Sequence, residues 1–134
     1  VMKAFSLSDA TLGIFDASVG KHISDSYDLL KGTDAGTLDN WEMSASYGLQ
    51  WRPTERLSFG PKYRLSYKIY DEGSNKDRDD LTNMVSLRIA YELASSVTLD
   101  LSGAYTTRST DGVPVDLDFD NLDTGAGLSL NARF

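Results

Sequence analysis

The segment 41–51, WEMSASYGLQW, alternates without exception between apolar and polar or small side chains. Its odd-numbered positions carry Trp, Met, Ala, Tyr and Leu, whereas its even-numbered positions carry Glu, Ser, Gly and Gln. Successive side chains of a β-strand point to opposite faces of the sheet. A helix, with about 3.6 residues per turn, would scatter the same apolar residues around its axis. The segment is therefore predicted to be a strand with one apolar and one polar face.

The same alternation recurs along most of the chain. It is clearest in four further segments and weaker in a fifth, and Asn83 and Met84 are its main interruptions. Residues 2–7, MKAFSL, resemble the end of another strand. The sequence thus predicts an all-β fold with about six full strands and a partial seventh. The five further strands are expected at 11–23, 57–70, 81–93, 97–108 and 122–134.

The connections between these strands alternate in length. Short links are expected near 8–10, 52–56 and 94–96, and long polar links at 24–40, 71–80 and 109–121. Tight turns at one end and long loops at the other are typical of an antiparallel up-and-down meander, as in outer-membrane barrels. No domain boundary interrupts the pattern, so residues 1–134 are predicted to form one domain. A strand missed within 24–40 remains an alternative.

The predicted strands are long, at about 11–14 residues, whereas strands of soluble proteins average about 5–6. A tilted strand needs about 9–11 residues to span a bilayer. No charged residue falls on the apolar face of the five clearest strands, where it would cost about 2–4 kcal/mol at the bilayer centre. We therefore expect a transmembrane β-barrel, with a soluble β-sandwich or calyx as the alternative.

Aromatic residues gather near the predicted strand ends. Rings at both membrane interfaces are expected for a barrel in lipid. The expected interface residues are Trp51, Phe59, Tyr91 and Phe134 toward the short turns, and Trp41, Tyr67 and Tyr105 toward the long loops.

The polar face carries isolated charges of both signs among Ser and Gly. Lys62, Arg64 and Lys68 share one strand and could form a basic ladder that attracts anions in a pore. Alternatively, the cations pair with Glu42, Glu92, Asp100 and Asp123 and merely fill the interior. The candidate pore-lining residues are Glu42, Lys62, Arg64, Lys68, Arg88, Glu92, Asp100, Arg108 and Arg133.

Composition argues against several other functions. The 20 acidic and 13 basic residues give a net charge of −7, which disfavours a nucleic-acid partner. The absence of cysteine excludes thiolate chemistry and Cys-type zinc sites. His22 is the only histidine and no nucleophile motif accompanies it, and the acidic loops do not match an EF-hand. We expect no enzymatic activity, no cofactor and no metal site.

The final residues, GAGLSLNARF, resemble the terminal signal of bacterial outer-membrane β-barrel proteins. That signal has a terminal Phe, here Phe134, with apolar residues two, four and six positions before it, here Ala132, Leu130 and Leu128. The resemblance, to porin-like proteins in general, implies location in the outer membrane of a Gram-negative bacterium. It further implies contact with the lipid bilayer and lipopolysaccharide, and recognition of the last strand by the barrel-assembly machinery.

The expected strand number is too small for a closed barrel, because single-chain bacterial barrels have at least eight strands and an even number. We therefore expect residues 1–134 to be the C-terminal part of a larger barrel, completed by preceding strands or by other chains. The expected function is a polar pore for small solutes or an exported polymer. The alternatives are a structural or adhesive barrel with a plugged lumen, or a soluble binding protein.

Pro61 is expected to interrupt strand pairing locally.

Overall fold

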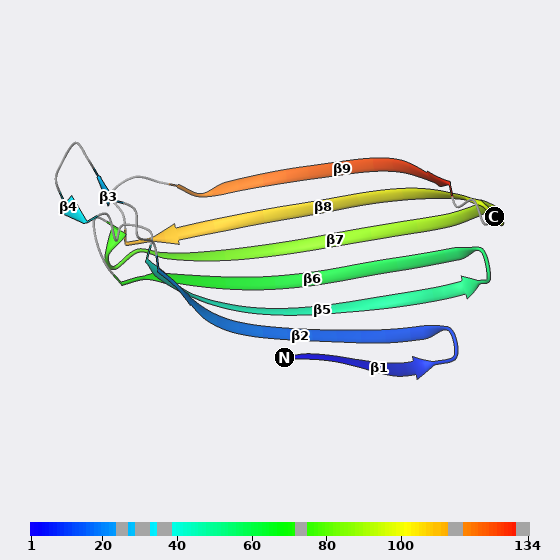
Figure 1. Cartoon of the computed structure of the whole chain (residues 1–134), viewed down its shortest axis with the longest axis horizontal. Helices are drawn as coiled ribbons and strands as arrows, with labels where there is room; N and C mark the ends of the chain where they lie inside the picture. The colour runs from blue at the N-terminus through cyan, green and yellow to red at the C-terminus, as the bar shows by residue number, and fades with distance from the viewer. Residues whose placement is uncertain (24–26, 29–32, 35–38, 72–74, 113–116, 131–134) are drawn as a thin grey trace.

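The computed structural model describes residues 1–23, 27–28, 33–34, 39–71, 75–112 and 117–130. Seven antiparallel strands form a single sheet in which each strand pairs with its neighbours in the chain (Figure 1). A separate two-stranded sheet joins β3 (Tyr27–Asp28) to β4 (Thr33–Asp34). The strands of the main sheet, in spatial order, are β1 (Met2–Ser8), β2 (Thr11–His22), β5 (Asn40–Thr54), β6 (Leu57–Tyr70), β7 (Asp79–Ala94), β8 (Val97–Asp111) and β9 (Phe119–Leu130).

The all-β, up-and-down architecture predicted from the alternation is confirmed, with β1 as the seventh strand. Several strands run further than the sequence pattern indicated. The strand predicted at 41–51 continues to Thr54, and the strand predicted to begin at 81 begins at Asp79. The segment 24–40, predicted to be a link, contains the small β3–β4 pair. The predictions for Asn131, Ala132, Arg133 and Phe134 lie outside the described residues.

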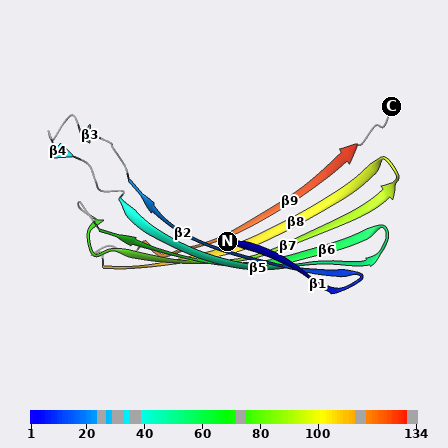
Figure 2. The same ribbon diagram turned by 60° about the horizontal axis from the view of Figure 1, so that its bottom comes forward.

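The sheet is strongly curved but open (Figure 2). Its edges are β1 and β9, which pair with β2 and β8 respectively and not with each other. Six successive antiparallel steps separate the edges, so β1 and β9 run in the same direction. The described residues thus form an arc of sheet and not a closed barrel.

The register assigns every strand residue to one of two faces, because residues paired across strands share a face. One row crosses five strands through Tyr47, Tyr63, Val85, Tyr105 and Leu122, and is apolar or aromatic throughout. The adjacent row, on the opposite face, is polar or small. Its members are Gly48, Lys62, Ser86, Ala104 and Asp123.

Burial in this sheet is the reverse of that in a soluble domain. No hydrophobic side chain is buried among the residues that the structure describes, and many large apolar side chains are exposed, including Val85 at 57% and Leu122 at 68%. The apolar face thus has no covering layer. Apart from Gly13, the buried residues are polar, and they are Asp39, Asn40, Ser44, Ser46, Ser66 and Asp80.

The short turns step steadily along the hydrogen-bond ladder. Thr11, the first residue after the first turn, shares a row across the strands with Phe59. The first residue after the second turn is Leu57, which lies two residues beyond Phe59 toward the short-turn end of the sheet. Leu57 shares a row with Leu99, and the third turn ends at Val97, again two residues further out. Successive short turns are two strands apart, so the end of the sheet shifts by one residue for each strand. With about 3.3 Å per residue and about 4.8 Å between strands, the rim is inclined by about 35° to the hydrogen-bonding direction.

Pro61 interrupts the ladder, as predicted, because its ring nitrogen has no hydrogen to donate. Pairing of β5 with β6 runs to Gly48 opposite Lys62 and resumes at Trp51 opposite Phe59 in the same register. On its other side Pro61 stays paired with Leu87 of β7. The local loss of hydrogen bonds is therefore absorbed without shifting the strands.

Gly112, at the end of β8, should tolerate a side chain poorly. Its φ is +79°, and a Cβ there would lie 2.0 Å from the carbonyl oxygen of Asp77. We predict that Gly112→Ala lowers the free energy of unfolding by about 1–3 kcal/mol, measured by urea titration with tryptophan fluorescence. Gly20→Ala is the matched control, because a Cβ at Gly20 meets nothing within 4 Å. Equal losses for the two variants would contradict the assignment.

Candidate functional site on the polar face

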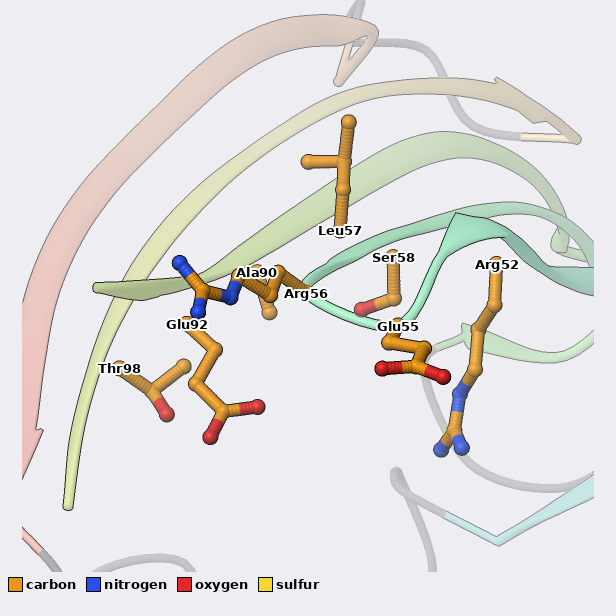
Figure 3. A pocket seen from close by; sticks show the side chains of 8 residues that line it. All are labelled: Arg52, Glu55, Arg56, Leu57, Ser58, Ala90, Glu92 and Thr98. Atoms are coloured by element: carbon orange, nitrogen blue, oxygen red, sulfur yellow. The ribbon is translucent and has the colours of Figure 1, made fainter. Parts of the chain in front are cut away.

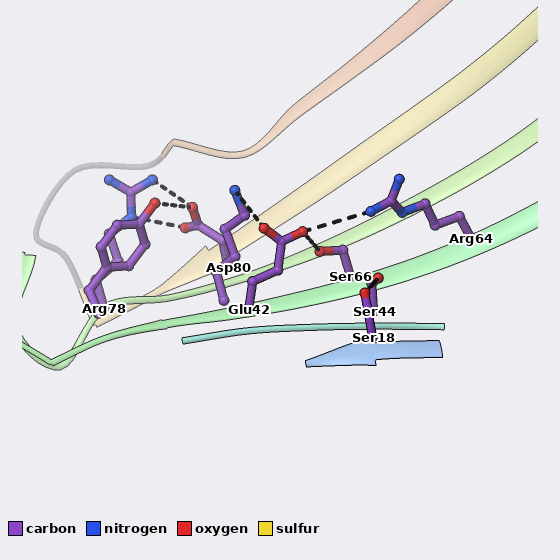
Figure 4. Close-up of polar contacts among 9 residues, drawn as sticks. Ser18, Glu42, Ser44, Arg64, Ser66, Arg78 and Asp80 are labelled. Atoms are coloured by element: carbon purple, nitrogen blue, oxygen red, sulfur yellow. Dashed lines mark hydrogen bonds and ion pairs between the residues drawn. The ribbon is translucent and has the colours of Figure 1, made fainter. Parts of the chain in front are cut away.

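The polar face lies on the inside of the curve. Figure 4 shows Glu42, Ser66 and Asp80 rising from the strands on the side toward which β8 and β9 bend. Of the nine predicted pore-lining residues, Arg133 lies outside the described residues. The register places the other eight together on this face, and they are Glu42, Lys62, Arg64, Lys68, Arg88, Glu92, Asp100 and Arg108.

Glu42 is the centre of the first polar cluster. Its carboxylate lies 3.5 Å from Nζ of Lys68 and 3.9 Å from Nη2 of Arg64. The hydroxyl of Ser66 donates a hydrogen bond of 3.0 Å to Glu42 Oε1. One carboxylate of β5 thus offsets the repulsion between two cations of β6, and Figure 4 shows its contacts with Arg64 and Ser66.

A second cluster lies at the long-loop end, where Arg78 precedes β7. Its guanidinium donates two hydrogen bonds to Asp80, of 2.9 and 2.8 Å, and lies 4.9 Å from the ring centre of Tyr70. The hydrogen bonds to the Asp80 carboxylate raise the pKa of Arg78 above its ordinary value. Asp80 is only 3% exposed. A bidentate pair of this kind holds the Arg78 side chain against the start of β7.

A third cluster lies toward the short turns. Arg88 of β7 donates to Asp100 of β8 through Nη2 at 2.5 Å and Nε at 3.0 Å. The other carboxylate oxygen of Asp100 accepts a hydrogen bond of 3.0 Å from Ser129 of β9. Three neighbouring strands are therefore joined by side chains as well as by their backbones.

Sequence reasoning missed the hydroxyl row between these clusters, and the Arg78–Asp80 pair. Ser18 and Ser44 share a hydrogen bond of 2.8 Å, and their row continues through Ser66 and Thr82. Serine at alternate positions was visible in the sequence, but which serines meet depends on register. Ser44 and Ser66 are buried.

The hypothesis that the interior charges simply neutralise one another is supported in part. Glu42 and Asp100 form the expected ion pairs. In the described part of the chain, Glu92 and Asp123 form no ion pair with a basic side chain, and Lys62 forms none with an acidic one. Charges of both signs therefore remain free to face solvent or a solute.

Further unpaired charges surround a hollow of 220 Å³ at the short-turn end. Figure 3 shows Arg52, Glu55, Arg56 and Glu92 around it, with their charged groups pointing in different directions. None of the four forms an ion pair with another described residue. The arrangement keeps this rim hydrated.

The apolar face carries the predicted aromatic residues, apart from Phe134, which is not described. Trp51 and Phe59 stack with ring centres 5.5 Å apart. Three tyrosine hydroxyls donate to acceptors on the next strand: Tyr63 to Asn83 at 2.7 Å, Tyr105 to Asp120 at 3.3 Å, and Tyr67 to Asp79. Each acceptor lies two residues nearer the long loops than the residue paired with the tyrosine. Asn83, an interruption of the sequence pattern, is thus a hydrogen-bond partner for Tyr63.

Comparison with known proteins identifies no relative. No family model matches the sequence, and no curated protein or solved structure matches the chain. Within the described ranges, no helix is long and apolar enough to cross a membrane. No group of three or more His, Asp or Glu side chains in those ranges could hold a metal ion. The resemblance of the last residues to outer-membrane proteins therefore stays a prediction from sequence.

We predict that Glu42→Gln lowers the free energy of unfolding by about 1 kcal/mol at low salt, because Arg64 and Lys68 lose their shared carboxylate. The effect should shrink as ionic strength rises, since the side chains of Arg64 and Lys68 are 44% and 38% exposed. Urea titrations at two salt concentrations measure both quantities. Glu92→Gln removes a carboxylate without an ion pair and should change stability by less than about 0.5 kcal/mol. Equal effects of the two variants at low salt would contradict the role of Glu42.

Proposed function

We propose that this sheet is an arc of a closed outer-membrane β-barrel whose polar inner face lines a pore for small solutes. The observation that carries the proposal is the reversed burial. Polar side chains are buried on the concave face, whereas every large apolar side chain of the described strands stays at least partly exposed. A face of this kind needs an apolar surrounding, and lipid supplies one without a second protein layer.

The dimensions of the apolar face fit a bilayer. Trp51 and Trp41 mark its two ends on β5 and are ten residues apart, a distance of about 33 Å along the strand. With the strands tilted by about 35°, as the stagger of the turns implies, this becomes roughly 27 Å along the bilayer normal, close to the apolar band of about 25 Å in such barrels. The tilt itself agrees with the usual range of about 35–45°.

The tyrosine hydrogen bonds support a placement of the sheet across the bilayer, with the long loops at one surface and the short turns at the other. The hydroxyls of Tyr63, Tyr67 and Tyr105 are all directed toward the long-loop end. Tyrosine in a membrane protein places its ring among acyl chains and its hydroxyl toward the headgroups. The long loops would accordingly face one aqueous side and the short turns the other, with lipopolysaccharide around the loop end in the outer membrane.

Closure requires further strands, and their number must be odd. Because β1 and β9 run in the same direction, only an odd number of additional strands can connect them with antiparallel pairing throughout. The total is then even, as in single-chain bacterial barrels.

Copies of this sheet inserted in one orientation would instead meet through parallel edges. We therefore propose closure by strands from elsewhere in the same protein or from a different chain, with the barrel-assembly machinery guiding insertion.

The clusters around Glu42, Asp80 and Asp100 favour a second candidate, a structural barrel with a plugged lumen, because they cross-link the inner face. Free charges at Lys62, Glu92 and the short-turn rim favour the open pore, since a filled lumen would leave them buried and unpaired.

Lipid contact can be tested with single tryptophans at neighbouring positions. In a Trp41→Phe, Trp51→Phe background, Val85→Trp places the probe on the apolar face and Ser86→Trp places it on the polar face. We predict that brominated lipids quench the fluorescence of the Val85→Trp protein strongly and that of the Ser86→Trp protein weakly. Equal quenching at both positions, or none, would contradict a lipid-facing apolar surface.

The pore itself is tested by single-channel recording. We predict that the full-length protein, reconstituted in a planar bilayer, produces discrete conductance steps, because the hydrated inner face gives ions a continuous polar path. Protein that shows lipid quenching but no conductance would be the plugged barrel instead. Heat-denatured protein at the same concentration is the control for detergent-induced leakage.

A further inference from the structure

A hollow of the inner face lies midway along the strands and has a volume of 430 Å³. Its floor is made of small residues, so the surface is depressed between longer side chains on either side. The lining includes Gly60, Lys62, Ser86, Arg88, Ser102 and Asp123, from four neighbouring strands.

Two opposite charges stand at opposite ends of this hollow. Lys62 of β6 and Asp123 of β9 lie in one row of the sheet, separated only by Ser86 and Ala104. The row covers three strand spacings, about 14 Å along the sheet, and curvature shortens the direct path between the side chains. The two side chains do not form an ion pair with each other, and a small molecule lying between them could contact both.

Both charges are available for a ligand. Neither takes part in an ion pair with the rest of the described chain. The nearest cation along the hollow, Arg88, is held by Asp100 and does not compete for Asp123. Asn121 donates a hydrogen bond of 2.8 Å to Asp123, which orients the carboxylate.

We propose that Lys62 and Asp123 bind the two ends of a small dipolar solute of the α-amino acid class. The solute carboxylate would accept hydrogen bonds from Lys62 and its ammonium group would donate to Asp123, with the side chain over the small residues between them. A simple anion would satisfy only Lys62 and a simple cation only Asp123. The inference rests on the proposed pore and names the class of solute that it would hold.

The test is calorimetric titration of L-alanine into the full-length protein in lipid nanodiscs. Lactate and ethylamine, which each lack one of the two charges, serve as comparison ligands. Lys62→Gln and Asp123→Asn should each weaken alanine binding about tenfold, the effect of losing one charge-assisted hydrogen bond. Glu92→Gln removes an inner carboxylate away from the hollow and should leave binding unchanged. The double variant Lys62→Asp with Asp123→Lys should restore it, because a dipolar ligand can bind in the reverse direction.

The outcomes separate this inference from the pore. Channels that conduct but do not bind alanine, or that bind alanine and lactate equally, would overturn the dipolar site and leave the pore standing. Binding that is unaffected by both single variants would also overturn the site. Protein that binds alanine with the expected variant pattern but does not conduct would uphold the site and overturn the pore. Far-UV circular dichroism of each variant, compared with that of the parent protein, shows whether the variant has folded.

Discussion

Backbone pairing between neighbouring strands is the interaction on which this structure depends, because the described residues bury no hydrophobic core. The strands from β5 to β9 have 12 to 16 residues each. Each of them is hydrogen-bonded to a neighbouring strand on both sides, except β9, which is an edge strand. Side chains add cross-strand ion pairs and hydrogen bonds on one face and aromatic contacts on the other. Both sets of contacts exist only because the register brings particular residues opposite each other.

The alternation of side chains predicted the fold class and both faces of the strands, because a period of two depends only on local backbone geometry. Trp41 and Trp51 therefore fall on the apolar face and Glu42 on the polar one, as expected. The pattern could not predict which residues pair, since sliding a strand by two residues preserves its faces. The Ser18–Ser44 contact and the stagger of the turns were invisible for that reason. Arg78 was missed because it lies in a link, where no periodicity operates.

The interior charges show why counting them in a sequence was not enough. Lys62, Arg64 and Lys68 form a similar series along β6, yet Arg64 and Lys68 share Glu42 whereas Lys62 has no acidic partner among the described residues. The difference comes from the facing strands: β5 presents a carboxylate opposite Lys68 and a glycine opposite Lys62. Neutralised positions stiffen the sheet, while free ones attract ligands and counter-ions. The same residue type thus has two different roles on one strand, at Lys68 and at Lys62, about 20 Å apart.

The up-and-down strand order has a consequence for folding speed. Every strand of the main sheet pairs with the strands that precede and follow it within that sheet. Most contacting residues are therefore separated by short stretches of sequence, and contact order is low for a sheet of this size. Hairpins can then form one after another, each extending an existing edge. We expect the pairing of β2 with β5 to be the slowest, because their link is the longest between paired strands, although the entropy of closing a loop grows only gradually with its length. Until that step occurs, the β1–β2 hairpin is not yet joined to the five strands that follow it in the sheet, and a hairpin alone has marginal stability.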